Sequence, residues 1–139
     1  MQPQGLTICA SSFGSSETVD KLAAAVADHG MAILARIDHA AAAAAVGLDL
    51  RPTTVLIFGN ARAGTPLMQQ AQTLGIDLPL RALVWEDENG LTWLAYNDPA
   101  WIWQRHGAGD GAEKVVAAMT EVLAAVSQQG TAQTKGEGP

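Results

Sequence analysis

The chain has 139 residues, a formal net charge of −6 at pH 7 and a pI of about 4.8. This length fits one domain, and a composition of 48% hydrophobic and 16% charged residues is too apolar for a disordered chain. The acidic charge argues against a nucleic-acid-binding groove, because such grooves need clustered Lys and Arg to neutralise phosphates.

Cysteine usage and the lack of targeting signals indicate the compartment. Cys9 is the single cysteine, which excludes an internal disulfide and a multi-cysteine metal site. The start of the chain lacks the basic segment and apolar core of a signal peptide. No apolar run approaches the roughly 18 residues that a membrane span needs. We therefore expect a cytoplasmic protein without membrane contact, since a lone thiol fits a reducing compartment.

The first half of the chain alternates strand and helix patterns. Apolar runs with strand character are separated by stretches of helical spacing, which begin at capping residues and end at glycines. The predicted elements are strands over residues 6–13, 31–38 and 53–58, and helices over residues 15–29 and 40–46. The continuous apolar run of the third strand predicts that both of its faces are covered.

The second half contains a predicted hairpin and three predicted helices. Asn89-Gly90 stands between two alternating strands, which is the strongest short-range hairpin signal. Thr65-Pro66 and Asp98-Pro99 each read as a cap followed by proline at the first helical position. The predicted elements are a loop over residues 59–64, helices over 65–74, 98–106 and 113–126, and strands over 80–86 and 91–96.

These elements predict an α/β (α+β) fold. We expect a two-layer sandwich in which a mixed five-stranded sheet, with a hairpin at residues 80–96, carries helices mainly on one face. Residues 5–128 are predicted to form a single domain. Residues 129–139 have no apolar anchor and are predicted to be a flexible C-terminal tail.

The segment from Gly59 to Thr65 is the first candidate site. It follows a buried strand and opens a predicted helix, where free backbone N–H groups and the helix dipole favour an anion. It differs from a phosphate-binding loop, since Thr65-Pro66 replaces the Lys and Ser/Thr of that motif. We therefore favour a tight turn that needs glycines over a binding site for nucleoside triphosphates. Binding of a small anion or a polar metabolite at this segment remains an alternative.

The three histidines have different contexts. His29 and His106 each precede a glycine at a predicted helix end, where a ring nitrogen can donate to the last carbonyls. His39 follows Asp38 where a strand turns into the alanine helix, and a helix N-terminus disfavours the charged ring. His39 is therefore the candidate ligand or acid/base group, beside the alternative of a hydrogen-bonded structural residue.

Acidic and aromatic residues gather in one part of the chain. Five of the seven aromatic residues lie between Trp85 and Trp103, and the two tryptophans of the helix at 98–106 cannot both face one core. Glu86, Asp87 and Glu88 could form a carboxylate pair for hydrolysis, but two of them lie in the hairpin turn. No spacing resembles a metal motif, so we predict no metal site and identify no cofactor.

The chain resembles the domain-of-unknown-function 302 family over residues 13–123. The residues that carry the resemblance are Ile37-Asp38-His39-Ala40, Phe58-Gly59-Asn60, Ala63-Gly64-Thr65-Pro66-Leu67-Met68, Leu78-Pro79-Leu80, Val84-Trp85-Glu86-Asp87, Tyr96-Asn97-Asp98-Pro99 and Arg105-His106. The resemblance implies a two-layer fold with a mixed five-stranded sheet and a homodimer, and it supplies no reaction.

Polar residues at these matched positions fall where predicted strands end and helices begin. Because ligands collect at the carboxyl ends of strands in α/β sheets, we expect a shared polar pocket. Its candidate ligand-binding residues are His39, Gly59, Asn60, Gly64, Thr65, Tyr96, Asp98 and His106. His39, Asn60 and Tyr96 have no sufficient explanation as caps, so the hypothesis depends on their convergence, within one chain or at a dimer seam.

Three functions follow from these observations. The first is a small-ligand-binding domain for an anionic or polar metabolite, of open catalytic status, with His39 as anchor or acid/base. The second is a non-catalytic interaction module that forms a homodimer or binds another protein through apolar helix faces and a tryptophan. The third is a metal-dependent enzyme whose ligands the fold brings together.

Overall fold

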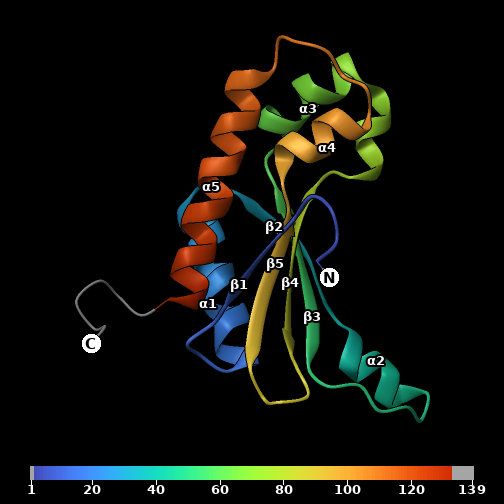
Figure 1. Cartoon of the computed structure of the whole chain (residues 1–139), viewed down its shortest axis with the longest axis vertical. Helices are drawn as coiled ribbons and strands as arrows, with labels where there is room; N and C mark the ends of the chain where they lie inside the picture. Colours follow the sequence, from blue (N-terminus) through green and yellow to red (C-terminus); the bar gives the residue numbers. More distant parts are fainter. Residues whose placement is uncertain (1, 133–139) are drawn as a thin grey trace.

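The computed structural model describes residues 2–132, which form one antiparallel sheet flanked by helices (Figure 1). The sheet order is β1-β5-β4-β3-β2. The strands are β1 (Leu6–Ala10), β2 (Ala32–Asp38), β3 (Thr53–Gly59), β4 (Leu80–Glu86) and β5 (Thr92–Asn97). The helices are α1 (Ser15–Asp28), α2 (His39–Ala45), α3 (Ala61–Gln70), η1 (Gln72–Ile76), α4 (Pro99–Arg105) and α5 (Glu113–Thr131).

The predicted α+β fold with a five-stranded sheet is confirmed, but the sheet is not mixed. All four strand pairs are antiparallel. Strands β2 to β5 are neighbours in both sequence and space, so the chain reverses direction at each connection. Within the described chain, α1 is the one helix that connects the two edges of the sheet, since it joins β1 to β2. Interleaved helices were therefore a misleading sign of parallel strands.

One face of the sheet carries the hydrophobic core. Leu22 and Val26 of α1 and Leu123 of α5 pack on inward-facing strand residues such as Phe58 and Leu94, all at most 1% exposed. Alternate strand residues point to this layer. The prediction that β3 is covered on both faces is wrong, since its residues alternate between buried and half-buried positions.

The opposite face, here called the outer sheet face, is apolar and carries no helix within residues 2–132. The strand register aligns one row of apolar side chains across all five strands, namely Ile8, Ala95, Leu83, Val55 and Ile37. Trp85 and Trp93 are direct partners across β4 and β5 on this face. Large apolar surfaces of this kind usually mark interaction sites.

Helix α3 begins earlier than predicted. Asn60 is its N-cap, and the Asn60 side-chain oxygen accepts a hydrogen bond of 2.9 Å from the Arg62 N–H. Residues 61–64 are therefore helical, and Thr65-Pro66 lies inside α3 instead of starting it. Two capping signals compete here, and the earlier one is used because alanines follow it and extend the helix.

Helix α5 ends later than predicted. It continues to Thr131, and Ser127, Gly130 and Thr131 are buried. A Cβ atom on Gly130 would lie 3.2 Å from the Leu22 Cβ atom, so this glycine allows α5 to approach α1 closely. Residues 129–131 are thus part of the fold, which contradicts the prediction of a tail from residue 129. The rest of the predicted tail, residues 133–139, lies outside the described residues.

Candidate functional site

The predicted convergence of His39, Asn60 and Tyr96 within one chain is wrong. Strands β2 and β3 are antiparallel, so Asp38 pairs with Thr54 while Gly59 pairs with Ala32. His39 and Asn60 follow opposite ends of this ladder and are about 20 Å apart by strand rise. His39 is exposed at the start of α2, whereas Tyr96 is buried in the core at 7% exposure. The expectation failed because it assumed parallel strands.

A groove of about 700 Å³ lies at the opposite end of the sheet from His39. Its walls come from α3 and α5, and its floor from the start of β2, the end of β3 and the Leu78–Pro79–Leu80 segment. Of the eight predicted ligand-binding residues, four line it: Gly59, Asn60, Gly64 and Thr65. A volume of this size matches pockets that hold small molecules.

The lining of the groove is mainly apolar, unlike the polar pocket expected from the sequence. Val115, Ala118, Met119 and Val122 of α5 face Ala61, Ala63 and Met68 of α3. The polar side chains of the lining are His29, Asn60, Thr65 and Lys114. Among residues 2–132, no Asp or Glu belongs to the lining, although the chain carries 14 acidic residues. The groove therefore favours a neutral or anionic group beside an apolar body.

Two of the polar lining residues, His29 and Asn60, make side-chain hydrogen bonds to the backbone at helix ends. The His29 Nδ1–H donates to the Ala25 carbonyl at 2.8 Å, which confirms the predicted contact of His29 with the end of α1. In the neutral ring this leaves Nε2 as the acceptor. Asn60 uses its side-chain oxygen to cap α3, so only its amide NH₂ is left for a ligand.

Tyr96 and Asp98 form a second neighbourhood, outside the groove lining. Asp98 precedes α4, and its carboxylate accepts a hydrogen bond from the Thr7 hydroxyl of β1. Burial raises the pKa of Tyr96 above its ordinary value, so the phenol is neutral at pH 7. The hydrogen bond between Thr7 and Asp98 joins β1 to the residue that follows β5. This contact and the burial of Tyr96 give Asp98 and Tyr96 structural roles in the folded chain.

His106 belongs to a third neighbourhood, which joins η1 to α4. The His106 side chain is 8% exposed, and its Nε2 lies 2.6 Å from Oδ2 of Asp77. Because the carboxylate accepts from Nε2–H, a neutral His106 ring accepts the Thr73 hydroxyl at Nδ1, 2.8 Å away. Arg105 donates to both Asp77 oxygens at 2.9 and 2.7 Å.

The Asp77 carboxylate is the centre of this third neighbourhood. Burial alone would raise the pKa of Asp77, but hydrogen bonds from His106 and Arg105 and their charges outweigh burial and lower it. The order hydroxyl, imidazole, carboxylate resembles a nucleophilic triad. Thr73, Asp77 and His106 all lie outside the groove lining, so we assign their contacts to holding η1 against α4.

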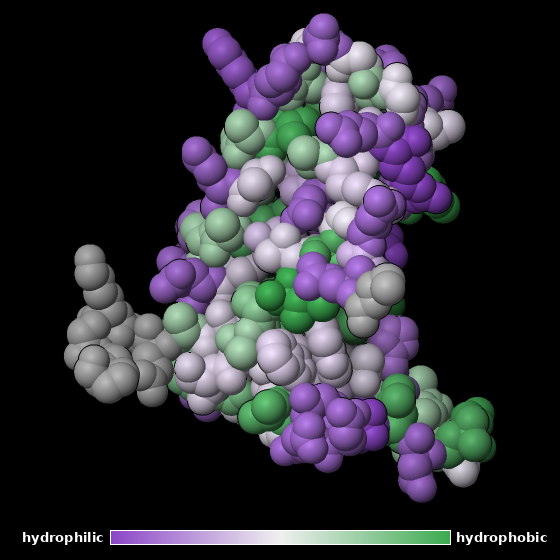
Figure 2. Space-filling model, in the orientation of Figure 1, coloured by the Kyte–Doolittle hydropathy of each residue, from purple (hydrophilic) through white to green (hydrophobic). Residues whose placement is uncertain are grey.

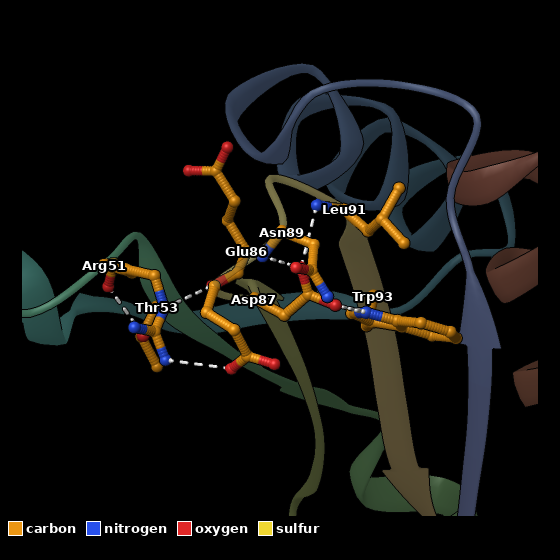
Figure 3. Close-up of polar contacts among 8 residues, drawn as sticks. Arg51, Thr53, Glu86, Asp87, Asn89, Leu91 and Trp93 are labelled. Carbon is orange, nitrogen blue, oxygen red and sulfur yellow. Dashed lines mark hydrogen bonds and ion pairs between the residues drawn. The ribbon is translucent and has the colours of Figure 1, made fainter.

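The carboxylates of the hairpin are used by the turn itself. Asp87 accepts hydrogen bonds of 2.9 Å from the N–H groups of Asn89 and Leu91 and from the Trp93 indole (Figure 3). The Trp93 indole and these two backbone donors hold the pKa of Asp87 below its ordinary value. A carboxylate so engaged is ionised at neutral pH and shapes the turn, so Asp87 is not available as the proton donor of a carboxylate pair.

Metal ligands and the single thiol offer no further site. Among residues 2–132, no group of three His, Cys, Asp or Glu side chains lies close enough to hold a metal ion. Cys9 is half-buried, and burial raises the pKa of its thiol. The thiol is therefore protonated at neutral pH, which makes it a poor nucleophile.

Sequence reasoning missed most of the groove. Lys114 and the apolar residues of α5 line it, as does the Leu78–Pro79 segment with its cis peptide bond. These segments lie far apart in the chain and share no motif, so only the packing of α5 beside α3 reveals the site. The absence of acidic residues over 114–119 is a weak signal that was available.

Sequence comparison matches this chain to part of longer proteins. Two similar relatives are the fluoride-specific ion channel FluC 1 of Brucella suis and FluC 2 of Brucella melitensis, each 46% identical over 115 residues. The match covers 83% of this chain but only 45% and 43% of those proteins, so the chain spans less than half their length. Within residues 2–132, no helix is long and apolar enough to cross a membrane.

A solved structure and a family model give the same assignment. The crystal structure of an uncharacterized conserved DUF302 protein from Bacillus stearothermophilus superposes with a TM-score of 0.80 at 21% identity, covering 91% of this chain and 98% of that one. The model of the family "Domain of unknown function DUF302" matches residues 8–126. The chain therefore belongs to the DUF302 family.

Proposed function

We propose that the protein binds a small, mainly apolar molecule with a neutral or anionic polar group in the groove between α3 and α5. The observation that carries this proposal is the groove itself, with its volume of about 700 Å³ and its apolar lining free of carboxylates. Ligand sites in proteins typically combine such a lining with a few polar groups that fix orientation.

The placement of the polar groups supports an amphipathic ligand. Lys114 is exposed at the first turn of α5, and the amide of Asn60 lies at the first turn of α3. The apolar part of the ligand would lie against Met68, Met119 and Val122, and methionines adapt readily to varied shapes. The polar end would then face Lys114 and Asn60.

Decanoate, a ten-carbon carboxylate, tests this function by isothermal titration calorimetry. We expect saturable binding to the natural chain and at least about tenfold weaker binding to Ala118→Trp, whose indole fills the groove. Ala117→Trp is the matched control, because Ala117 is exposed on the same helix but outside the lining. Equal affinity of the two variants, or no binding to the natural chain, would contradict the proposal. Decanol in place of decanoate reports whether Lys114 selects the anion.

A second candidate function is an interaction module, which the outer sheet face favours. Trp85 and Trp93 stand side by side on this face, and the hydrogen bond to Asp87 fixes the Trp93 ring. Trp85 and Trp93 are half-buried, and tryptophans are enriched at the centres of protein interfaces. The matched relatives carry a similar segment in one chain with the remainder of a fluoride-specific ion channel. We propose such a channel as the partner of the outer sheet face.

Co-purification tests the second candidate. A detergent-solubilised fluoride channel should retain the natural chain, while Trp85→Asp should abolish retention and Leu91→Asp, in the exposed turn, should not. Retention of both variants alike would contradict an interface on this face.

We further propose a homodimer and a cytoplasmic location. The proposed location rests on the lone thiol, which suits a reducing compartment.

A further inference from the structure

Helix α2 stands out because little of it is covered within the described chain. None of its seven residues is buried, and Val46 and Leu48, which follow it, are 72% and 63% exposed. Figure 1 shows α2 projecting from the sheet, and Figure 2 shows hydrophobic residues gathered at that position. A seven-residue alanine helix has little stability of its own in water. This segment, residues 39–50, is here called the arm.

Strand β2 is an open edge of the sheet with an apolar surface. Its neighbour is β3 on one side, and no strand of residues 2–132 pairs with its other side. Ile33, Leu34 and Ile37 are 42%, 58% and 41% exposed. Proteins usually protect such edges with charge, and Arg36 is the one basic residue of β2, already paired with Asp20 of α1.

A two-fold axis through Ala35 relates the edge, the arm and the groove. Antiparallel pairing of two β2 strands about Ala35 places Ala32 opposite Asp38 of a second copy, and Met31 opposite its His39. The arm follows the carboxyl end of β2, whereas Met31, Ala32 and Leu34 at its amino end line the groove. The same operation therefore brings each arm to the groove of the other copy.

We propose that two copies pair through β2 and that the arm of each copy closes the groove of the other. This inference rests on the proposed ligand site and adds that the site is shared between subunits. Residues 40–48 of the arm supply an uncharged apolar cover, since they contain only Ala, Val, Gly and Leu, and Asp49 follows them. That composition matches a lining without carboxylates.

The pairing also gives His39 a place at the site. Gly59 pairs with Ala32 within one chain, so His39 of the second copy lies two strand spacings, about 10 Å, from the Gly59–Asn60 corner. Closed two-fold assemblies use one surface patch on both subunits, and here a single symmetry operation covers the exposed edge, the exposed arm and the groove. A second copy is therefore the occupant that accounts for all three features.

Two cysteine variants in a Cys9→Ser background test the geometry. Ala35→Cys places two thiols across the proposed axis, at a separation that antiparallel pairs allow a disulfide to bridge, so oxidation should give a covalent dimer. Leu48→Cys with Ala118→Cys should be joined between copies by a short bismaleimide, because arm and groove lie at opposite ends of β2 within one chain. Two controls should give no covalent dimer. Thr120→Cys alone is the control for oxidation, and Leu91→Cys combined with Ala118→Cys is the control for the bismaleimide.

Light scattering and decanoate binding complete the test. Ile37→Lys should convert the dimer to a monomer, while Leu91→Lys, at an apolar position that is even more exposed, should leave it dimeric. A monomeric natural chain, or a dimer without the Ala35 cross-link, would overturn the inference even if decanoate binds. Cross-links in a protein that binds no decanoate would overturn the proposed ligand while confirming the pairing. Unchanged decanoate affinity of Leu48→Ser would show that the arm does not close the site.

Discussion

Replacing Gly5 with valine is expected to lower the free energy of unfolding by about 2–4 kcal/mol. Gly5 has φ of +74°, a conformation that β-branched residues adopt only with strain. A Cβ atom there would lie 2.2 Å from Cδ2 of the Trp101 ring, so the indole must move. The Gly5 carbonyl also accepts the Asp98 N–H at 2.8 Å, at the start of α4.

Gly109→Val is the matched control for this prediction. Gly109 has no positive φ, and no atom lies within 4 Å of a Cβ built there. Its effect is expected to stay within about 0.5 kcal/mol, as for other exposed sites. Urea unfolding followed by circular dichroism measures both variants. Equal stability of the two would show that Trp101 does not pack over Gly5.

Asp77→Ala is expected to cost about 2–3 kcal/mol at neutral pH. The substitution removes the acceptor of His106, whose side chain is 8% exposed, and both acceptors of Arg105. The loss is larger than for an exposed ion pair because the His106 N–H group is left buried without a partner. Asp110→Ala, at an exposed carboxylate, is the control and should change stability little.

The pH dependence of this difference follows from the lowered pKa of Asp77. A carboxyl group whose folded pKa lies below its ordinary value of 3.8 adds stability above that value and loses it as the pH falls through the folded pKa. The gap between the natural chain and Asp77→Ala should therefore shrink as the pH is lowered below 3.8. Thermal unfolding across this range measures the gap, and a constant gap at all acidic pH values would contradict the assigned contacts.

Local features of this fold could be predicted from the sequence because their causes are local. Asp38 caps α2 by accepting the Ala41 N–H, and Asn89-Gly90 forms the turn between β4 and β5, with Gly90 at φ of +80°. His29 contacts the end of α1 as expected. Each of these needs only residues within four positions of one another, so side-chain chemistry and backbone preference decide the outcome.

Features that depend on distant segments could not be predicted. The direction of β3 relative to β2 separates His39 from Asn60, and no residue in either strand encodes that direction. Gly130 extends α5 because Leu22, more than 100 positions away, packs against it. The groove likewise forms where α5 lies beside α3, so its lining became visible only with the packing of these helices.

The groove between α3 and α5 is proposed to bind a mainly apolar ligand. Titration of decanoate into the ¹⁵N-labelled chain, followed by two-dimensional NMR, shows whether and where the ligand binds. We expect saturable shifts of the Gly64, Ala118 and Met119 amides, with the indole signals of Trp85 and Trp93 unchanged. Shifts confined to the two indoles, or no saturable shift of the groove amides, would contradict this proposal.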